Sequence, residues 1–133
     1  MTFSEIKERV MFQTNNDADD LGDFEPHIGD YINDGYDRLV VIWAYQHVPS
    51  TDYPALAADA DEPKTPEWTH RYLADWATWL IYRNGNPQKQ SRGMAFREAF
   101  ESMLRTVSGQ GGENGLDDSG NMKQYKNFVN IPV

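Results

Sequence analysis

Residues 65–85, TPEWTHRYLADWATWLIYRNG, decide the fold of this chain. Large apolar side chains recur here at steps of three and four residues, at Trp68, Tyr72, Leu73, Trp76, Ala77, Leu80 and Ile81. This spacing places them on one face of an α-helix. Thr65-Pro66-Glu67 is typical of a capped helix start, and Asn84-Gly85 is typical of an end with a left-handed residue. The stretch therefore predicts an aromatic-rich helix with a buried face.

A second helix is expected to follow at once, because Asn86-Pro87 is typical of another helix start. Such a short connection predicts an antiparallel helical hairpin. The second helix should end around Ser108-Gly109. Its expected apolar positions are Met94, Phe96, Phe100, Met103, Leu104 and Val107.

Two further helices are expected before this hairpin. Residues 4–12 form a short one, which Thr2 or Ser4 can cap. A long one starts at Pro26 and ends before Pro49, and its apolar stripe comprises Ile28, Tyr31, Ile32, Gly35, Leu39, Ile42, Trp43 and Gln46. Val40 and Val41 widen this stripe, which predicts burial on more than one side. The proline-bearing connection over residues 48–65 is expected to wrap on the core as an ordered loop.

The predicted fold is all-α, a small bundle of about four helices with long loops and an extended C-terminal arm. Residues 1–108 make up the helical domain, and residues 109–120, rich in Gly and Asp, are expected to form a flexible loop. Residues 121–133 form the arm. This arm carries Tyr125 and Phe128, which we expect to dock on the body or on another subunit.

Length and composition exclude several classes of protein. The 133 residues suit one domain, and the absence of cysteine excludes disulfides and thiolate metal sites. The longest apolar run, residues 39–45, is far shorter than the roughly 20 residues that span a bilayer. Residues 1–5 lack the basic and apolar regions of a signal peptide. We therefore expect synthesis in a cytoplasm and no membrane contact.

The net charge of −9 is unevenly distributed. Residues 1–66 hold 14 acidic and 4 basic side chains, a net charge of −10. Residues 67–133 hold 7 acidic and 8 basic side chains, a net charge of +1. This imbalance can serve solubility alone, or it can bring an acidic surface to a basic surface on a neighbour. Direct DNA binding by the first half is disfavoured, because like charges repel.

No metal or cofactor site is expected. The acidic residues 13–25 depart from a calcium-binding loop, because Leu21 and Ile28 stand where ligands are needed. They predict a solvated acidic loop that includes Asp17. His27, His47 and His70 lack the i, i+4 spacing of a helical zinc site, which indicates structural or surface roles.

Catalysis is not expected either. Asp30 and Asp34 share one helical face, as an acid and a base can, but a solvated face explains them more simply. The chain has no GxSxG motif and no phosphate-binding loop. The sequence therefore predicts a protein that is not an enzyme.

Several residues are candidates for an interface. The aromatic stripe of residues 68–79 favours core packing over nucleotide stacking, but Trp79 lies off the stripe and is predicted to face a partner. The second helix of the hairpin has a partly basic face. This face is either a salt-bridged surface or one that meets the acidic half of an adjacent copy. The candidates are Trp79, Lys89, Arg92, Arg97 and Arg105, together with Tyr125 and Phe128 in the arm.

The order of these elements resembles the small all-α head–tail connector, or head-completion, proteins of tailed phages. The likeness spans about residues 4–107. It is carried by SEIKERV at residues 4–10, YINDGYDRL at 31–39, the acidic proline-bearing loop at 56–66 and LADWATWLIY at 73–82. The helix through Phe96, Phe100 and Leu104 completes it.

This resemblance implies a structural virion protein, made in the bacterial host cytoplasm. Copies of such proteins form a ring between the portal and the tail or stopper proteins, and DNA passes through without sequence-specific binding. A charge-polarised subunit suits a head-to-tail ring. The alternative is a small acidic regulatory or inhibitor protein that covers a basic partner surface.

Overall fold

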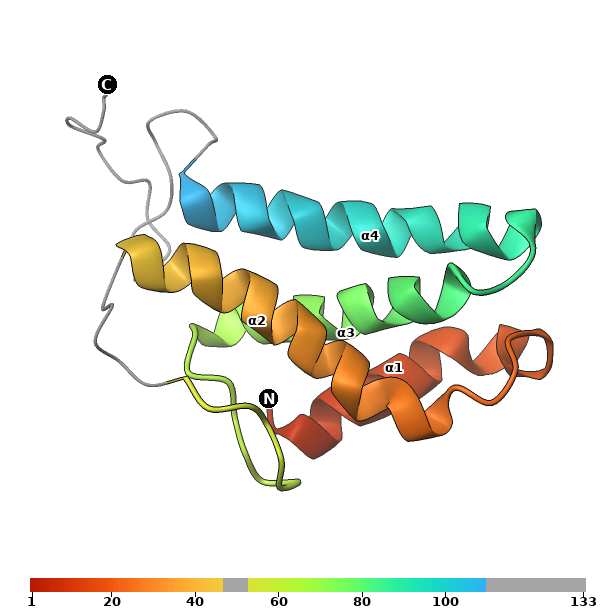
Figure 1. The fold of residues 1–133 in the computed structure, drawn as a ribbon, viewed down its shortest axis with the longest axis horizontal. Coiled ribbons are helices and arrows are strands. Elements are labelled where there is room, and N and C mark those ends of the chain that lie inside the picture. Colours follow the sequence, from red (N-terminus) through yellow and green to blue (C-terminus); the bar gives the residue numbers. More distant parts are fainter. Residues whose placement is uncertain (47–52, 110–133) are drawn as a thin grey trace.

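The computed structural model describes residues 1–46 and 53–109, and within these ranges the chain is all-α, as predicted. Its helices are α1 (Phe3–Thr14), α2 (Ile28–Gln46), α3 (Glu67–Tyr82) and α4 (Pro87–Ser108), shown in Figure 1. Two 3₁₀ helices, Asn15–Asp20 and Glu25–His27, lie between α1 and α2. The predicted arm, with Tyr125 and Phe128, and residues 110–120 of the predicted loop lie outside the described residues.

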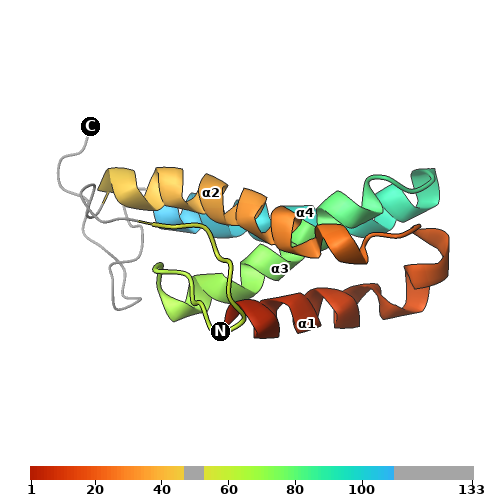
Figure 2. The ribbon, with the colours of Figure 1, turned by 60° about the horizontal axis from the view of Figure 1, so that its bottom comes forward.

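Helix α3 is the centre of the bundle. It packs against each of the other three helices, whereas α1 and α4 lie on opposite sides of it without contacting each other (Figure 2). Because α3 has neighbours on several sides, burial extends well beyond the predicted stripe. The buried residues of α3 are Thr69, His70, Leu73, Ala74, Asp75, Trp76, Ala77, Thr78, Leu80, Ile81 and Tyr82.

The α3–α4 hairpin is closely packed, and a glycine permits this. A Cβ atom at Gly93 would lie 2.6 Å from Cβ of Tyr82 and 2.9 Å from Cε3 of Trp79. Further along the hairpin the rings of Trp76 and Phe100 lie 4.8 Å apart, centroid to centroid. The antiparallel hairpin predicted from residues 65–108 is therefore confirmed.

Helix α1 begins with a capping box. The Thr2 hydroxyl accepts from the Glu5 amide, and the Glu5 carboxylate accepts from the Thr2 amide, so two helix-end donors are satisfied. The buried side of α1 consists of Phe3, Ile6, Val10 and Thr14.

The described part of the connection before α3, from Tyr53 onward, wraps on the core, as predicted, whereas residues 48–52 of the predicted connection lie outside the described residues. Leu56 is buried, and its backbone N–H and C=O both bond the side-chain amide of Asn33 on α2. These two bonds satisfy polar groups that burial of Leu56 removes from water.

Two predictions about burial were wrong. Val41 is 71% exposed, because it lies one position further round α2 than the half-buried Val40 and so faces away from α3 and α4. Met94 is 47% exposed, because it follows Gly93, which faces α3. Both errors come from extending an apolar stripe to every neighbouring apolar residue.

Two predictions about helix ends were also wrong. Thr65 does not cap α3. Its hydroxyl bonds the Thr69 hydroxyl instead, and the cap position is Pro66. Gly85 is not left-handed. Arg83 caps α3 in the right-handed region, and the described glycines in the left-handed region are Gly22 and Gly109, the second of which ends α4.

Candidate functional site

The acidic segment after α1 holds a buried carboxylate, so the prediction that Asp17 is solvated was wrong. Asp17 is 7% exposed. Its carboxylate accepts from the Tyr82 hydroxyl at 2.5 Å and from Nζ of Lys89 at 2.6 Å, and it also accepts from the Arg92 guanidinium. The neighbouring Asp20 lies 3.2 Å from Lys89 Nζ. We call these five residues the Asp17 cluster.

These hydrogen bonds shift the pKa values of Asp17 and Tyr82 in the Asp17 cluster. The Lys89 hydrogen bond, then those from Tyr82 and Arg92, hold the pKa of Asp17 well below its ordinary value. Burial, followed by the bond to Asp17, raises the pKa of Tyr82 to about 12. The cluster therefore joins the segment after α1 to the α3–α4 hairpin through ionised groups.

The four predicted cations of α4 fall into two pairs. Lys89, which is 7% exposed, and Arg92 meet Asp17 of the same chain. Thus acids of the first half, Asp17 and Asp20, meet two of these cations within one chain, and contact with an adjacent copy was only one of the two alternatives for this basic face.

The second pair of cations lies on the open side of α4. Arg97 lies 3.3 Å from Glu101 and Arg105 lies 2.7 Å from Glu98, and both arginine side chains are about half-exposed. These intrahelical ion pairs match a salt-bridged surface, and they leave both guanidinium groups accessible to a partner.

Trp79 is half-buried in the hairpin. The guanidinium of Arg97 lies over its ring, 5.5 Å from the centroid. Trp76 is 7% exposed, and its Nε1 donates to Asp34 at 2.7 Å. The stripe therefore packs largely into the core, and part of Trp79 remains available to solvent.

Asp75 is a buried carboxylate that sequence reasoning missed. It is 8% exposed, and it accepts from Nε2 of Gln13 at 2.9 Å. The side-chain oxygen Oε1 of Gln13 accepts in turn from the Thr78 hydroxyl at 2.6 Å. Burial raises the pKa of Asp75, since the amide only partly replaces water. The signal in the sequence was an acid in the middle of an aromatic helix.

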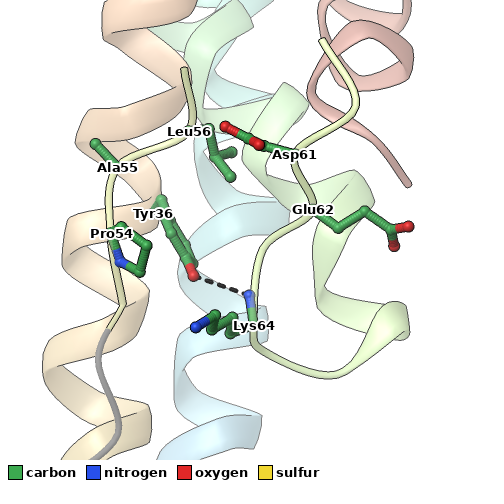
Figure 3. A pocket seen from close by; sticks show the side chains of 7 residues that line it. All are labelled: Tyr36, Pro54, Ala55, Leu56, Asp61, Glu62 and Lys64. Atoms are coloured by element: carbon green, nitrogen blue, oxygen red, sulfur yellow. Dashed lines mark hydrogen bonds between the residues drawn. The ribbon is translucent and has the colours of Figure 1, made fainter. Parts of the chain in front are cut away.

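A small cavity of about 190 Å³ lies between α2 and the loop before α3 (Figure 3). The Tyr36 hydroxyl accepts from the backbone N–H of Lys64 at 2.8 Å at one side of it. The Glu62 side chain points away from Tyr36, to the other side of the loop (Figure 3). The lining residues are Tyr36, Pro54, Ala55, Leu56, Asp61, Glu62 and Lys64.

Several charged and polar residues lie close together where the amino terminus of the chain contacts α3. The α-ammonium of Met1 lies 2.7 Å from Oε2 of Glu67, 2.9 Å from Nδ1 of His70 and 3.8 Å from Oε1 of Glu62. This contact lowers the pKa of Glu67. A hollow of about 360 Å³ adjoins the group, lined by Met1, Glu67, Trp68, Arg71 and Tyr72.

The most exposed large apolar side chains of the described residues lie at two places far apart. Phe12, near the end of α1, is 82% exposed. Val41 and Tyr45, in the last turns of α2, are 71% and 83% exposed. The C-terminal ends of α1 and α2 lie at opposite ends of the bundle's long axis (Figure 1).

Taken together, the described residues define an all-α domain with polar clusters and exposed apolar ends. None of the helices in the described ranges is long and apolar enough to cross a membrane. Comparison with protein-family models, with curated proteins and with solved structures found no match.

Proposed function

We propose that this chain is a structural head–tail connector of a tailed phage, which forms a ring from copies of itself between the portal and the tail or stopper proteins. The proposal places it in the virion, after synthesis in the bacterial host cytoplasm. It assigns no catalytic role to the chain.

The observation that carries the proposal is the pair of exposed apolar ends. Large apolar side chains at 71–83% exposure leave apolar area in water that a contact with a neighbour would bury. Phe12 at one end and Val41 with Tyr45 at the other are two different exposed surfaces. Contact between unlike surfaces is head-to-tail, and it gives a ring where the rotation between neighbours closes and an open filament where it does not.

Charge supports the same proposal. Six acids on the segment between α1 and α2, and on α2 itself, are exposed: Asp19, Asp20, Asp23, Glu25, Asp30 and Asp37. A channel lined by such residues repels phosphates, which lets DNA pass without being held. Arg97 and Arg105, on α4, are ion-paired within the helix but about half-exposed, so they can also contact an acidic surface of a neighbour.

Sedimentation velocity across a range of concentrations, with and without the portal protein from the same genome, tests this proposal. We expect the wild-type chain to form closed oligomers, alone or on the portal. Val41→Asp with Tyr45→Asp should weaken assembly at least about tenfold, since charge then enters a buried contact. Ser91→Asp, at an exposed position on α4, is the matched control. A wild-type monomer under all conditions, without portal binding, would contradict the proposal.

A further inference from the structure

We propose that Glu62, Glu67 and His70 form a zinc site at the start of α3. One ligand atom from each of them lies within 4.8 Å of the other two. Nothing in this inference depends on the proposed connector function, because it rests on the local geometry of the three side chains.

The chain places two of the ligands by helical spacing. Glu67 and His70 are three residues apart in the first turn of α3, so their side chains lie on the same face of the helix. The distance from Oε1 of Glu67 to Nδ1 of His70 is 3.4 Å. A tetrahedral zinc ion with bonds of about 2.0–2.1 Å holds its ligand atoms about 3.3–3.4 Å apart. This pair therefore already has the spacing that zinc requires.

His70 is held in the orientation and tautomer of a metal ligand. Its side chain is 3% exposed, and its Nε2 lies 2.8 Å from the carbonyl oxygen of Thr65. A carbonyl oxygen can only accept, so Nε2 donates to Thr65 and Nδ1 is the ring nitrogen that faces the Met1 ammonium, 2.9 Å away, and Glu67. Zinc-bound histidines commonly donate their other ring N–H to such a backbone carbonyl.

The third ligand comes from the loop before α3. Glu62 is 57% exposed and its side chain points away from Tyr36 (Figure 3), so rotation of this side chain can shorten its distance to Glu67 and His70. A nitrogen with two carboxylates is a donor set that zinc accepts, whereas calcium takes oxygen ligands. Three protein ligands leave a fourth position for water or another group.

A cation already lies among these atoms. The α-ammonium of Met1 contacts both glutamates and Nδ1 of His70. The three side chains thus attract positive charge, and zinc must compete with the ammonium for them. On zinc binding the ammonium moves away from the three ligands.

Calorimetric titration of the full chain with zinc chloride tests the site, with any purification tag at the C-terminal end. We expect one zinc per chain, and at least about tenfold weaker binding in Glu67→Gln and in Glu62→Gln. Both residues are more than half exposed, so these variants should keep the helical circular dichroism of the wild type. Glu25→Gln, exposed on the short helix before α2, is the matched control and should bind zinc as the wild type does.

Nitrogen NMR of the imidazoles gives a second readout that does not require a variant. Zinc should shift Nδ1 of His70 and leave His27 and His47 unchanged. Absence of zinc binding, equal binding in Glu67→Gln and the wild type, or shifts at His27 or His47 in place of His70 would overturn the inference.

Discussion

Replacing Asp17 with alanine tests whether a buried ionic cluster holds the bundle together. The change removes the acceptor of the Tyr82 hydroxyl and the nearest partner of Lys89, both of which are buried. Removing one partner of a buried ion pair costs about 3–5 kcal/mol. Arg92 is half-exposed and Lys89 keeps Asp20, so solvent and that second acid recover part of this loss. We expect a loss of about 2–3 kcal/mol in the free energy of unfolding.

Urea denaturation followed by far-ultraviolet circular dichroism measures this loss. The control is Asp23→Ala, an exposed acid in the same segment, for which we expect a change within about 0.5 kcal/mol. In the double variant with Lys89→Met, the loss should be smaller than the sum of the single losses, because no buried cation is left unpaired. Equal unfolding free energies for Asp17→Ala and Asp23→Ala would refute the reasoning.

Lowering the pH should remove the stabilisation that ionised Asp17 gives the folded chain. The folded pKa of Asp17 lies below its ordinary value of about 3.9, so folding favours the ionised form. The stabilisation is therefore present above the ordinary pKa and is lost as the pH falls through the folded pKa. In urea titrations at a series of pH values, the difference between the wild type and Asp17→Asn should be constant near neutrality and should shrink below about pH 4. A difference that grows toward acid pH would contradict this sign.

Two further variants test the close packing of the bundle and of its loop. Gly93→Ala should lower the free energy of unfolding by about 1–3 kcal/mol, because the new Cβ meets Tyr82 and this overlap outweighs the gain in helix propensity. A thermal melt of this variant that matches the wild type would contradict the prediction. Tyr36→Phe should cost about 1–2 kcal/mol in urea denaturation, because the Lys64 amide loses its acceptor. Tyr45→Phe, at an exposed tyrosine, should have no effect and serves as its control.

The helices could be predicted from the sequence because their signals are local. Apolar steps of three and four residues located α3 and α4, and prolines located the ends of the long connection. Val41 and Met94 were misplaced, because periodicity defines a face but does not say how wide a surface the neighbouring helices cover. That width depends on how α2 and α4 pack on α3.

The Asp17 cluster could not be predicted for a different reason. In the sequence Asp17 is one acid among several, and its partners Tyr82 and Lys89 come more than 60 residues later. Only the tertiary fold selects which acid is buried. His70 was predicted to be structural or on the surface, and it is buried with a hydrogen-bond partner at each ring nitrogen.

Electron microscopy of negatively stained protein, alone and mixed with the portal protein from the same genome, tests the central claim most directly. The connector proposal predicts closed rings of the chain, free at high concentration or seated on one face of the portal. Only dispersed monomers, with bare portals beside them at every concentration, would contradict it.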